Sequence, residues 1–83
     1  MPESNRPLVE RIARVLAGAA FSSNAEGSNP SASEEVDAAW REHVNQAEAV
    51  LHTMREPDER MASAGDAEVW RNMVEAALDS KID

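Results

Sequence analysis

Apolar residues recur at helical spacing in the first part of the chain. Between residues 7 and 20 they form one stripe: Leu8, Ile12, Val15, Leu16 and Ala19. Positions three and four apart share a face of a helix, so this spacing predicts an amphipathic helix. Pro7 suits the first turn, where the N–H group that proline lacks has no partner anyway. We therefore predict a helix over residues 7–20.

A second helical pattern begins at residue 34, and polar residues mark its start. Ser33 can cap the first turn, and Ser31 with Glu34 offers a capping-box alternative. One face then carries apolar residues with a histidine among them: Val36, Trp40, His43, Val44, Ala47, Val50, Leu51 and Met54. Because Pro57 disfavours helical geometry at the residue before it, we predict a helix over residues 34–55.

The last part of the chain predicts a short helical turn followed by a third helix. Pro57 opens the turn at 57–64, Gly65 ends it, and Asp66 can cap a helix at 67–79. The apolar face of that helix comprises Val69, Trp70, Met73, Val74, Ala77 and Leu78. No stretch shows the period of two that a half-buried strand requires. We predict an all-α fold, a three-helix bundle with a short helical turn at 57–64.

Residues 22–33 differ in composition from the segments on either side. They include five serines, two asparagines, one glycine and one proline, and no large apolar residue. Such a composition predicts a flexible connector, although loops of this length sometimes act as lids. We expect one domain over residues 1–83, with this connector inside it.

The three apolar stripes together predict the hydrophobic core. The short connection at 55–66 should lay the third helix back against the second. The residues expected to be buried are Leu8, Ile12, Val15, Leu16, Val36, Trp40, Val44, Ala47, Leu51, Met54, Met61, Trp70, Met73, Val74, Ala77 and Leu78.

Composition makes this core thin and the surface acidic. Leu, Ile, Val and Phe number only 14, while 16 acidic residues against 8 basic ones give a net charge of −8. So few large apolar residues with so much charge approach the composition of disordered chains. A negative field disfavours contact with nucleic acid or an anionic membrane, so we expect neither as a partner. The absence of cysteine suits a reducing compartment, and we expect a cytoplasmic protein.

Few residues could take part in catalysis or bind a metal ion. Nucleophilic catalysis needs a serine or cysteine beside a base, and His43 and His52 are the only histidines. Glu48, His52 and Glu56 stand four apart and could hold a divalent metal loosely, although a solvated row of charges explains them as well. Arg11 and Arg14 could touch phosphate, yet two arginines make no nucleic-acid footprint. We expect a protein without catalysis, cofactor or metal.

The two tryptophans admit two interpretations. Either they lie where helices cross and share a core, or one lies at an interface, where large aromatic residues are enriched. Methionine side chains would then surround that tryptophan with flexible apolar surface. The candidate interface residues are Trp40, His43, Met61, Trp70 and Met73.

Two segments near the end of the chain carry a family resemblance. Residues 55–61 read Arg-Glu-Pro-Asp-Glu-Arg-Met, and residues 70–78 read Trp-Arg-Asn-Met-Val-Glu-Ala-Ala-Leu. With the opening helix at 9–16, they resemble a family of small uncharacterised helical proteins from bacteria and their phages. The segment between Gly65 and Trp70 is shorter here than in that family. The resemblance implies a compact helical fold and a connection with phages, and no activity.

These observations lead to one functional expectation and two alternatives. We expect a small acidic, non-catalytic protein-interaction module that binds a protein partner or a second copy of itself, with a dimer as the expected form. An acidic decoy that imitates nucleic acid and occupies a basic protein is the first alternative. A metal-dependent enzyme using Glu48, His52 and Glu56 is the remote one.

Overall fold

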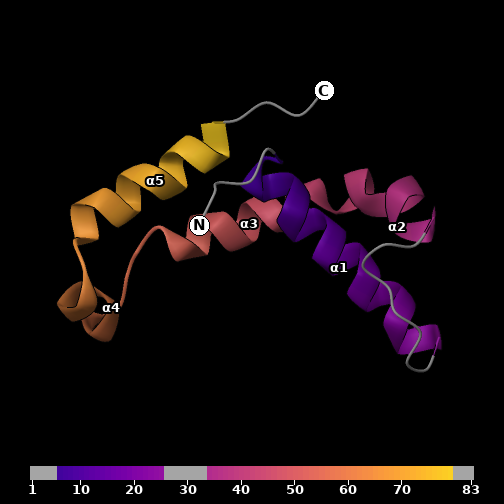
Figure 1. Ribbon diagram of the computed structural model, residues 1–83, viewed down its shortest axis with the longest axis horizontal. Helices are drawn as coiled ribbons and strands as arrows, with labels where there is room; N and C mark the ends of the chain where they lie inside the picture. The colour runs from indigo at the N-terminus through magenta and orange to yellow at the C-terminus, as the bar shows by residue number, and fades with distance from the viewer. Residues whose placement is uncertain (1–5, 26–33, 80–83) are drawn as a thin grey trace.

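The computed structural model describes residues 6–25 and 34–79, with the backbone alone for 21–25. Over these residues the chain is helical without a strand, which confirms the all-α fold (Figure 1). The elements are α1 (Leu8–Ala25), α2 (Glu34–Ala39), the 3₁₀ helix η1 (Trp40–His43), α3 (Val44–Met54), α4 (Glu59–Ala64) and α5 (Ala67–Asp79).

The helices form a body and an arm. In the body, α1 crosses the consecutive elements α2, η1 and α3 and packs against all three (Figure 1). In the arm, α4 turns the chain at one end of the molecule and α5 returns along α3. The molecule is elongated, with extents of 40 × 28 × 26 Å. None of the described helices has the length and apolar character needed to span a bilayer.

The predicted second helix is interrupted in its first half. Instead of one helix over 34–55, a 3₁₀ segment separates α2 from α3. The backbone departs from α-helical values at both ends of this segment, with ψ of −12° at Ala39 and 7° at His43. Short 3₁₀ pieces tighten a helix locally, and here the tightened turn carries Trp40 into the core. A continuous helix and a helix interrupted by a 3₁₀ turn have nearly the same spacing of apolar residues, so the sequence pattern could not reveal the interruption.

The first helix faces the core with a different stripe from the predicted one. Val9, Ala13 and Ala17 are buried together with Gly18, whereas Val15 is 64% exposed. This stripe lies one position along from Leu8, Ile12 and Leu16, which rotates the helix by about 100°. Small residues allow α1 to approach closely and leave room for the large Trp40 side chain in the shared core.

The serine-rich connector is shorter than predicted. α1 continues to Ala25, so residues 22–25 are helical rather than part of a loop. The rest of the predicted connector, 26–33, lies outside the described residues. The helix α1 therefore extends beyond the last residue of the apolar stripe, from which the end of the helix was predicted.

Most of the predicted core is buried or packs on the buried cluster. Val36, Trp40, Ala47, Leu51 and Val74 are buried. The half-buried residues around them are Leu8, Ile12, Leu16, Val44, Met54, Trp70, Ala77 and Leu78. The prediction is wrong for Val15, Met61 and Met73, which are exposed. Val15 lies on a face of α1 that no described element covers, and Met61 and Met73 lie on such a face of the arm.

The arm is held by caps and by one face of α5. Asp58 accepts the Met61 N–H at the start of α4, and Asp66 accepts the N–H groups of Glu68 and Val69 at the start of α5. α4 buries none of its residues, and α5 buries Val74. The arm is therefore ordered locally by its caps and attached to the body through α5.

Candidate functional site

The five candidate interface residues separate into two sets. Trp40 is only 4% exposed and belongs to the core of the body, so almost none of its surface is presented to a partner. His43, nearby, is half-buried with Nδ1 at 2.9 Å from Gln46 Oε1. Met61, Trp70 and Met73 come together in the arm, where they line one hollow.

This α4–α5 hollow has a volume of about 350 Å³ and lies where the chain turns from α4 into α5. Its lining is Pro57, Met61, Ala64, Gly65, Asp66, Ala67, Val69, Trp70 and Met73. Three large apolar side chains there remain exposed: Met61 at 41%, Val69 at 51% and Met73 at 65%. Because three large apolar side chains in one hollow remain in contact with water, this hollow is the strongest candidate for a contact with another molecule.

Trp70 connects the hollow to the body. Its Nε1–H donates to the carbonyl oxygen of Met54, the last residue of α3, at 2.6 Å. Two ion pairs support the same junction: Arg55 with Glu75 at 3.0 Å, and Arg71 with Glu56 at 3.3 Å. The indole N–H is thus satisfied internally, and the hydrogen bond holds the ring beside the hollow as a wall.

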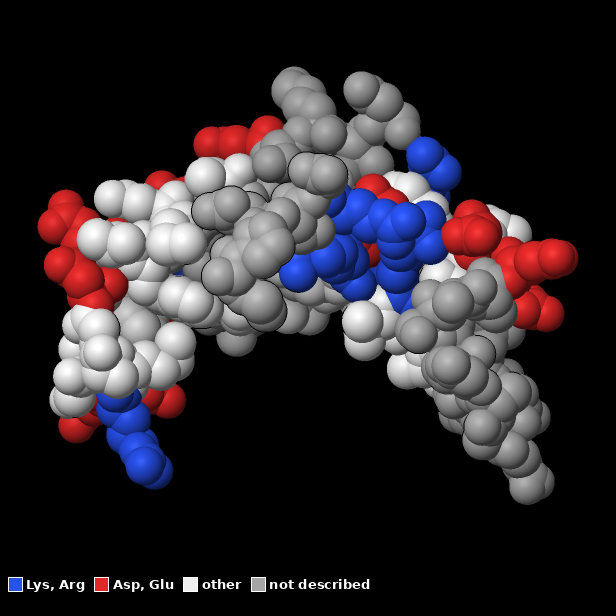
Figure 2. Space-filling view, viewed as in Figure 1, with Lys and Arg blue, Asp and Glu red and all other residues white. Residues whose placement is uncertain are grey.

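Acidic residues outnumber basic ones in the segment that forms the hollow, and Asp66 is part of its lining. Between residues 57 and 73 the chain carries four acidic residues, Asp58, Glu59, Asp66 and Glu68, and two arginines. Figure 2 shows uncharged side chains at the α4–α5 end of the molecule, with mostly acidic and some basic side chains at their border. A partner with basic residues beside its apolar ones would match this surface.

A second apolar surface lies on the body. This α1 groove also has a volume of about 350 Å³ and is lined by Leu8, Arg11, Ile12, Val15, Leu16 and Val50. The helical spacing predicted the apolar α1 residues as core, and Leu8, Ile12 and Leu16 do pack on the core while Val15 is exposed. Which face of an apolar helix is covered depends on its neighbours, so the spacing alone could not separate groove from core.

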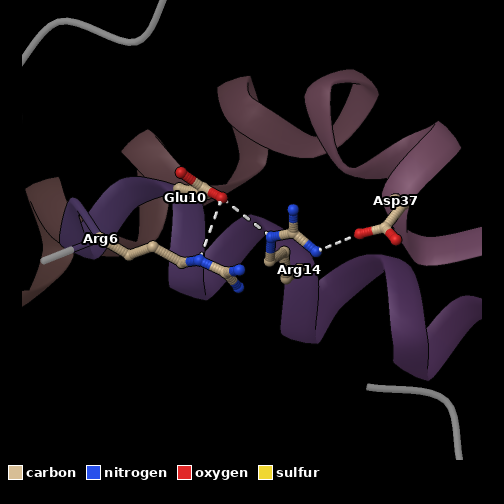
Figure 3. Close-up of polar contacts among 4 residues, drawn as sticks. All are labelled: Arg6, Glu10, Arg14 and Asp37. Atoms are coloured by element: carbon tan, nitrogen blue, oxygen red, sulfur yellow. Dashed lines mark hydrogen bonds and ion pairs between the residues drawn. The ribbon is translucent and has the colours of Figure 1, made fainter. Parts of the chain in front are cut away.

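Arg14 fastens α1 to α2 around Trp40. Its guanidinium lies 2.9 Å from Glu10 and 2.7 Å from Asp37, and Figure 3 shows it bridging the two carboxylates. The hydrogen bond to Asp37, followed by that to Glu10, raises the pKa of Arg14 above its ordinary value. Arg14 and Arg41 both lie over the Trp40 ring, 5.4 and 4.4 Å from its centroid. Arg14 is therefore engaged in structure and is not presented to a phosphate.

The possible metal ligands do not form a site. Across the described ranges, 6–25 and 34–79, no three His, Asp or Glu side chains are placed to hold a metal ion. α3 ends at Met54, so Glu56 leaves the helical register that would align it with Glu48 and His52. Glu56 pairs with Arg71 instead.

Comparisons with models of protein families, with curated proteins and with solved structures find no match. The family resemblance seen in residues 55–61 and 70–78 therefore stays a prediction. The case for a function rests on the two apolar surfaces.

Proposed function

We propose that this protein is a non-catalytic interaction module that self-associates through the α4–α5 hollow. One observation carries the proposal: Met61, Val69 and Met73 are large apolar side chains, 41%, 51% and 65% exposed, in a single hollow. Apolar residues scattered singly on a surface need no explanation, whereas a concave group of them does.

The apolar burial that the hollow offers supports weak association. Full burial of one valine or methionine side chain contributes about 1.5–3 kcal/mol. Covering the exposed parts of Met61, Val69 and Met73 therefore supplies a few kcal/mol, which must exceed the entropy lost when two molecules join. Methionine adapts its shape to a partner because it is unbranched and flexible. A dimer in a reducing compartment such as the cytoplasm fits this chain, which contains no cysteine.

The charge distribution favours this module over the nucleic-acid decoy. A decoy requires rows of carboxylates at phosphate spacing, whereas the described surface mixes signs. Asp37, Glu56 and Glu75 each form an ion pair with an arginine. Such neutralised carboxylates would attract a basic groove weakly.

Sedimentation of two matched variants tests the proposal. Met73→Glu places a charge in the hollow, while Asn72→Glu adds the same charge at an exposed α5 position outside it. We expect wild type and Asn72→Glu to associate as concentration rises, and Met73→Glu to remain monomeric because burial would desolvate its carboxylate. A monomeric wild type at high concentration, or a Met73→Glu variant that associates like wild type, would disprove the proposal.

A further inference from the structure

We infer that the α4–α5 hollow of one copy receives the α1 groove of a second copy. This inference rests on the proposed function, because it names the partner surface for the same hollow. The contact is head-to-tail: two different surfaces of the chain meet across the interface.

The charges beside the two surfaces have opposite signs. Of the three arginines between residues 6 and 20, Arg6 and Arg14 pair with Glu10 and Asp37, which leaves Arg11 beside the groove. Figure 2 shows basic side chains gathered where α1 crosses the body, away from the acidic border of the arm. Arg11 lines the groove, is exposed, and forms no ion pair with any described residue. Arg11 can therefore face the acidic border of the hollow, where Asp66 is part of the lining.

Pairing of like surfaces is disfavoured by the same charges. Two hollows placed face to face would bring their acidic borders together, and two α1 grooves would bring together their Arg11 side chains. Like charges juxtaposed across an interface oppose association and exclude wrong partners. The head-to-tail contact brings acidic and basic borders together.

Both surfaces are lined mainly by apolar side chains and are open to solvent. Val15 is the exposed member of the groove at 64%, and the half-buried Leu8 and Ile12 lie beside it on α1. Met61 and Met73 in the hollow are flexible enough to fit such branched side chains.

The two surfaces cannot meet within one molecule. α4 and the start of α5 form one end of the structure, whereas α1 crosses the body (Figure 1). The body and the junction at Trp70 hold them apart. Their contact therefore requires a second copy.

Mixing two defective variants tests this inference. Val15→Glu damages the groove and leaves the hollow intact, and Met73→Glu does the reverse. We expect each variant alone to be monomeric, and an equimolar mixture to form a heterodimer through the one intact groove and the one intact hollow. Asn45→Glu, an exposed neutral-to-acidic change on α3 outside both surfaces, should associate like wild type. Circular dichroism should show that all three remain folded, since both altered apolar residues are exposed.

The outcomes separate this inference from the proposed function. If Met73→Glu is monomeric but Val15→Glu self-associates like wild type, the hollow is an interface and the groove is not its occupant. A mixture that stays monomeric would also overturn the inference. If Met73→Glu self-associates like wild type, both proposals fail. Arg11→Glu gives a second readout: it should weaken wild-type association a few-fold at low salt and much less at high salt, and equal effects at both would contradict the charge argument.

Discussion

The body and the arm use similar apolar patterns and bury them to different extents. Both contain a tryptophan on an apolar helical stripe. Trp40 in the body is 4% exposed, whereas Trp70 in the arm is half-buried. The body buries seven of the eight core residues: Val9, Ala13, Ala17, Val36, Trp40, Ala47 and Leu51. The arm contributes the eighth, Val74.

The difference follows from the number of neighbours rather than from local sequence. In the body, α1 packs on α2, η1 and α3 together, while in the arm the main support of α5 is α3. A wide apolar face that packs mainly on one neighbour stays partly in water, as Val69 and Met73 show. Packing against α3 thus holds α5 in place, and part of the apolar face of α5 remains accessible to another molecule.

The largest expected effect comes from truncating the two tryptophans. Trp40→Ala should lower the free energy of unfolding by about 3–5 kcal/mol, because it leaves a large cavity in the body. Trp70→Ala should cost less, since Trp70 is already partly in water, and it should release α5 first. Urea unfolding measures the two energies, and hydrogen exchange should show α5 amides losing protection while α1 and α3 keep theirs. Equal losses in both variants would contradict the division into body and arm.

An intermediate effect is expected from enlarging α1 on its two sides. Ala13 is fully buried, so Ala13→Leu should overpack the body and cost about 1–3 kcal/mol. Ala19 is exposed on the same helix, so Ala19→Leu should change stability by less than about 0.5 kcal/mol. Thermal or urea unfolding compares the pair. If Ala19→Leu were the more damaging change, α1 would face the body with its other stripe.

The smallest effect concerns the ion pairs. A double-mutant cycle on Arg14→Met and Asp37→Asn should give a coupling energy of about 0.2–1 kcal/mol, since solvent screens Asp37. The side chain of Arg14 is only 17% exposed, against 43% for Arg55. The corresponding cycle on Arg55→Met and Glu75→Gln should therefore give a smaller value. A larger coupling in the arm would show that charge, rather than apolar packing, holds α5 to the body.

The parts of the fold that local chemistry decides were predictable. Pro57 marked the end of the second helical stretch, and Asp66 marked the start of α5, where its side chain does cap the helix. The predicted range 67–79 coincides with α5 (Ala67–Asp79). Such signals act between residues a few positions apart, so the sequence contains everything that they need.

The candidate site was predictable only in part. Met61, Trp70 and Met73 were named together as interface residues, but all three were also assigned to the core. Val69 was placed only on an apolar face, and the α1 groove was not recognised. An exposed apolar residue and a buried one have the same spacing on a helix, so no sequence signal separated them.

By itself, the sequence determined the helical class, the caps and the apolar stripes, because these depend on residues within one or two helical turns. Only the tertiary structure decided which stripe of α1 meets the body, where the second helix tightens into η1, and which apolar residues remain in water. Those outcomes depend on how small residues such as Ala13 and Ala17 let helices approach around Trp40. Close packing joins residues distant along the chain, and its result at each position is set by all the neighbours at once.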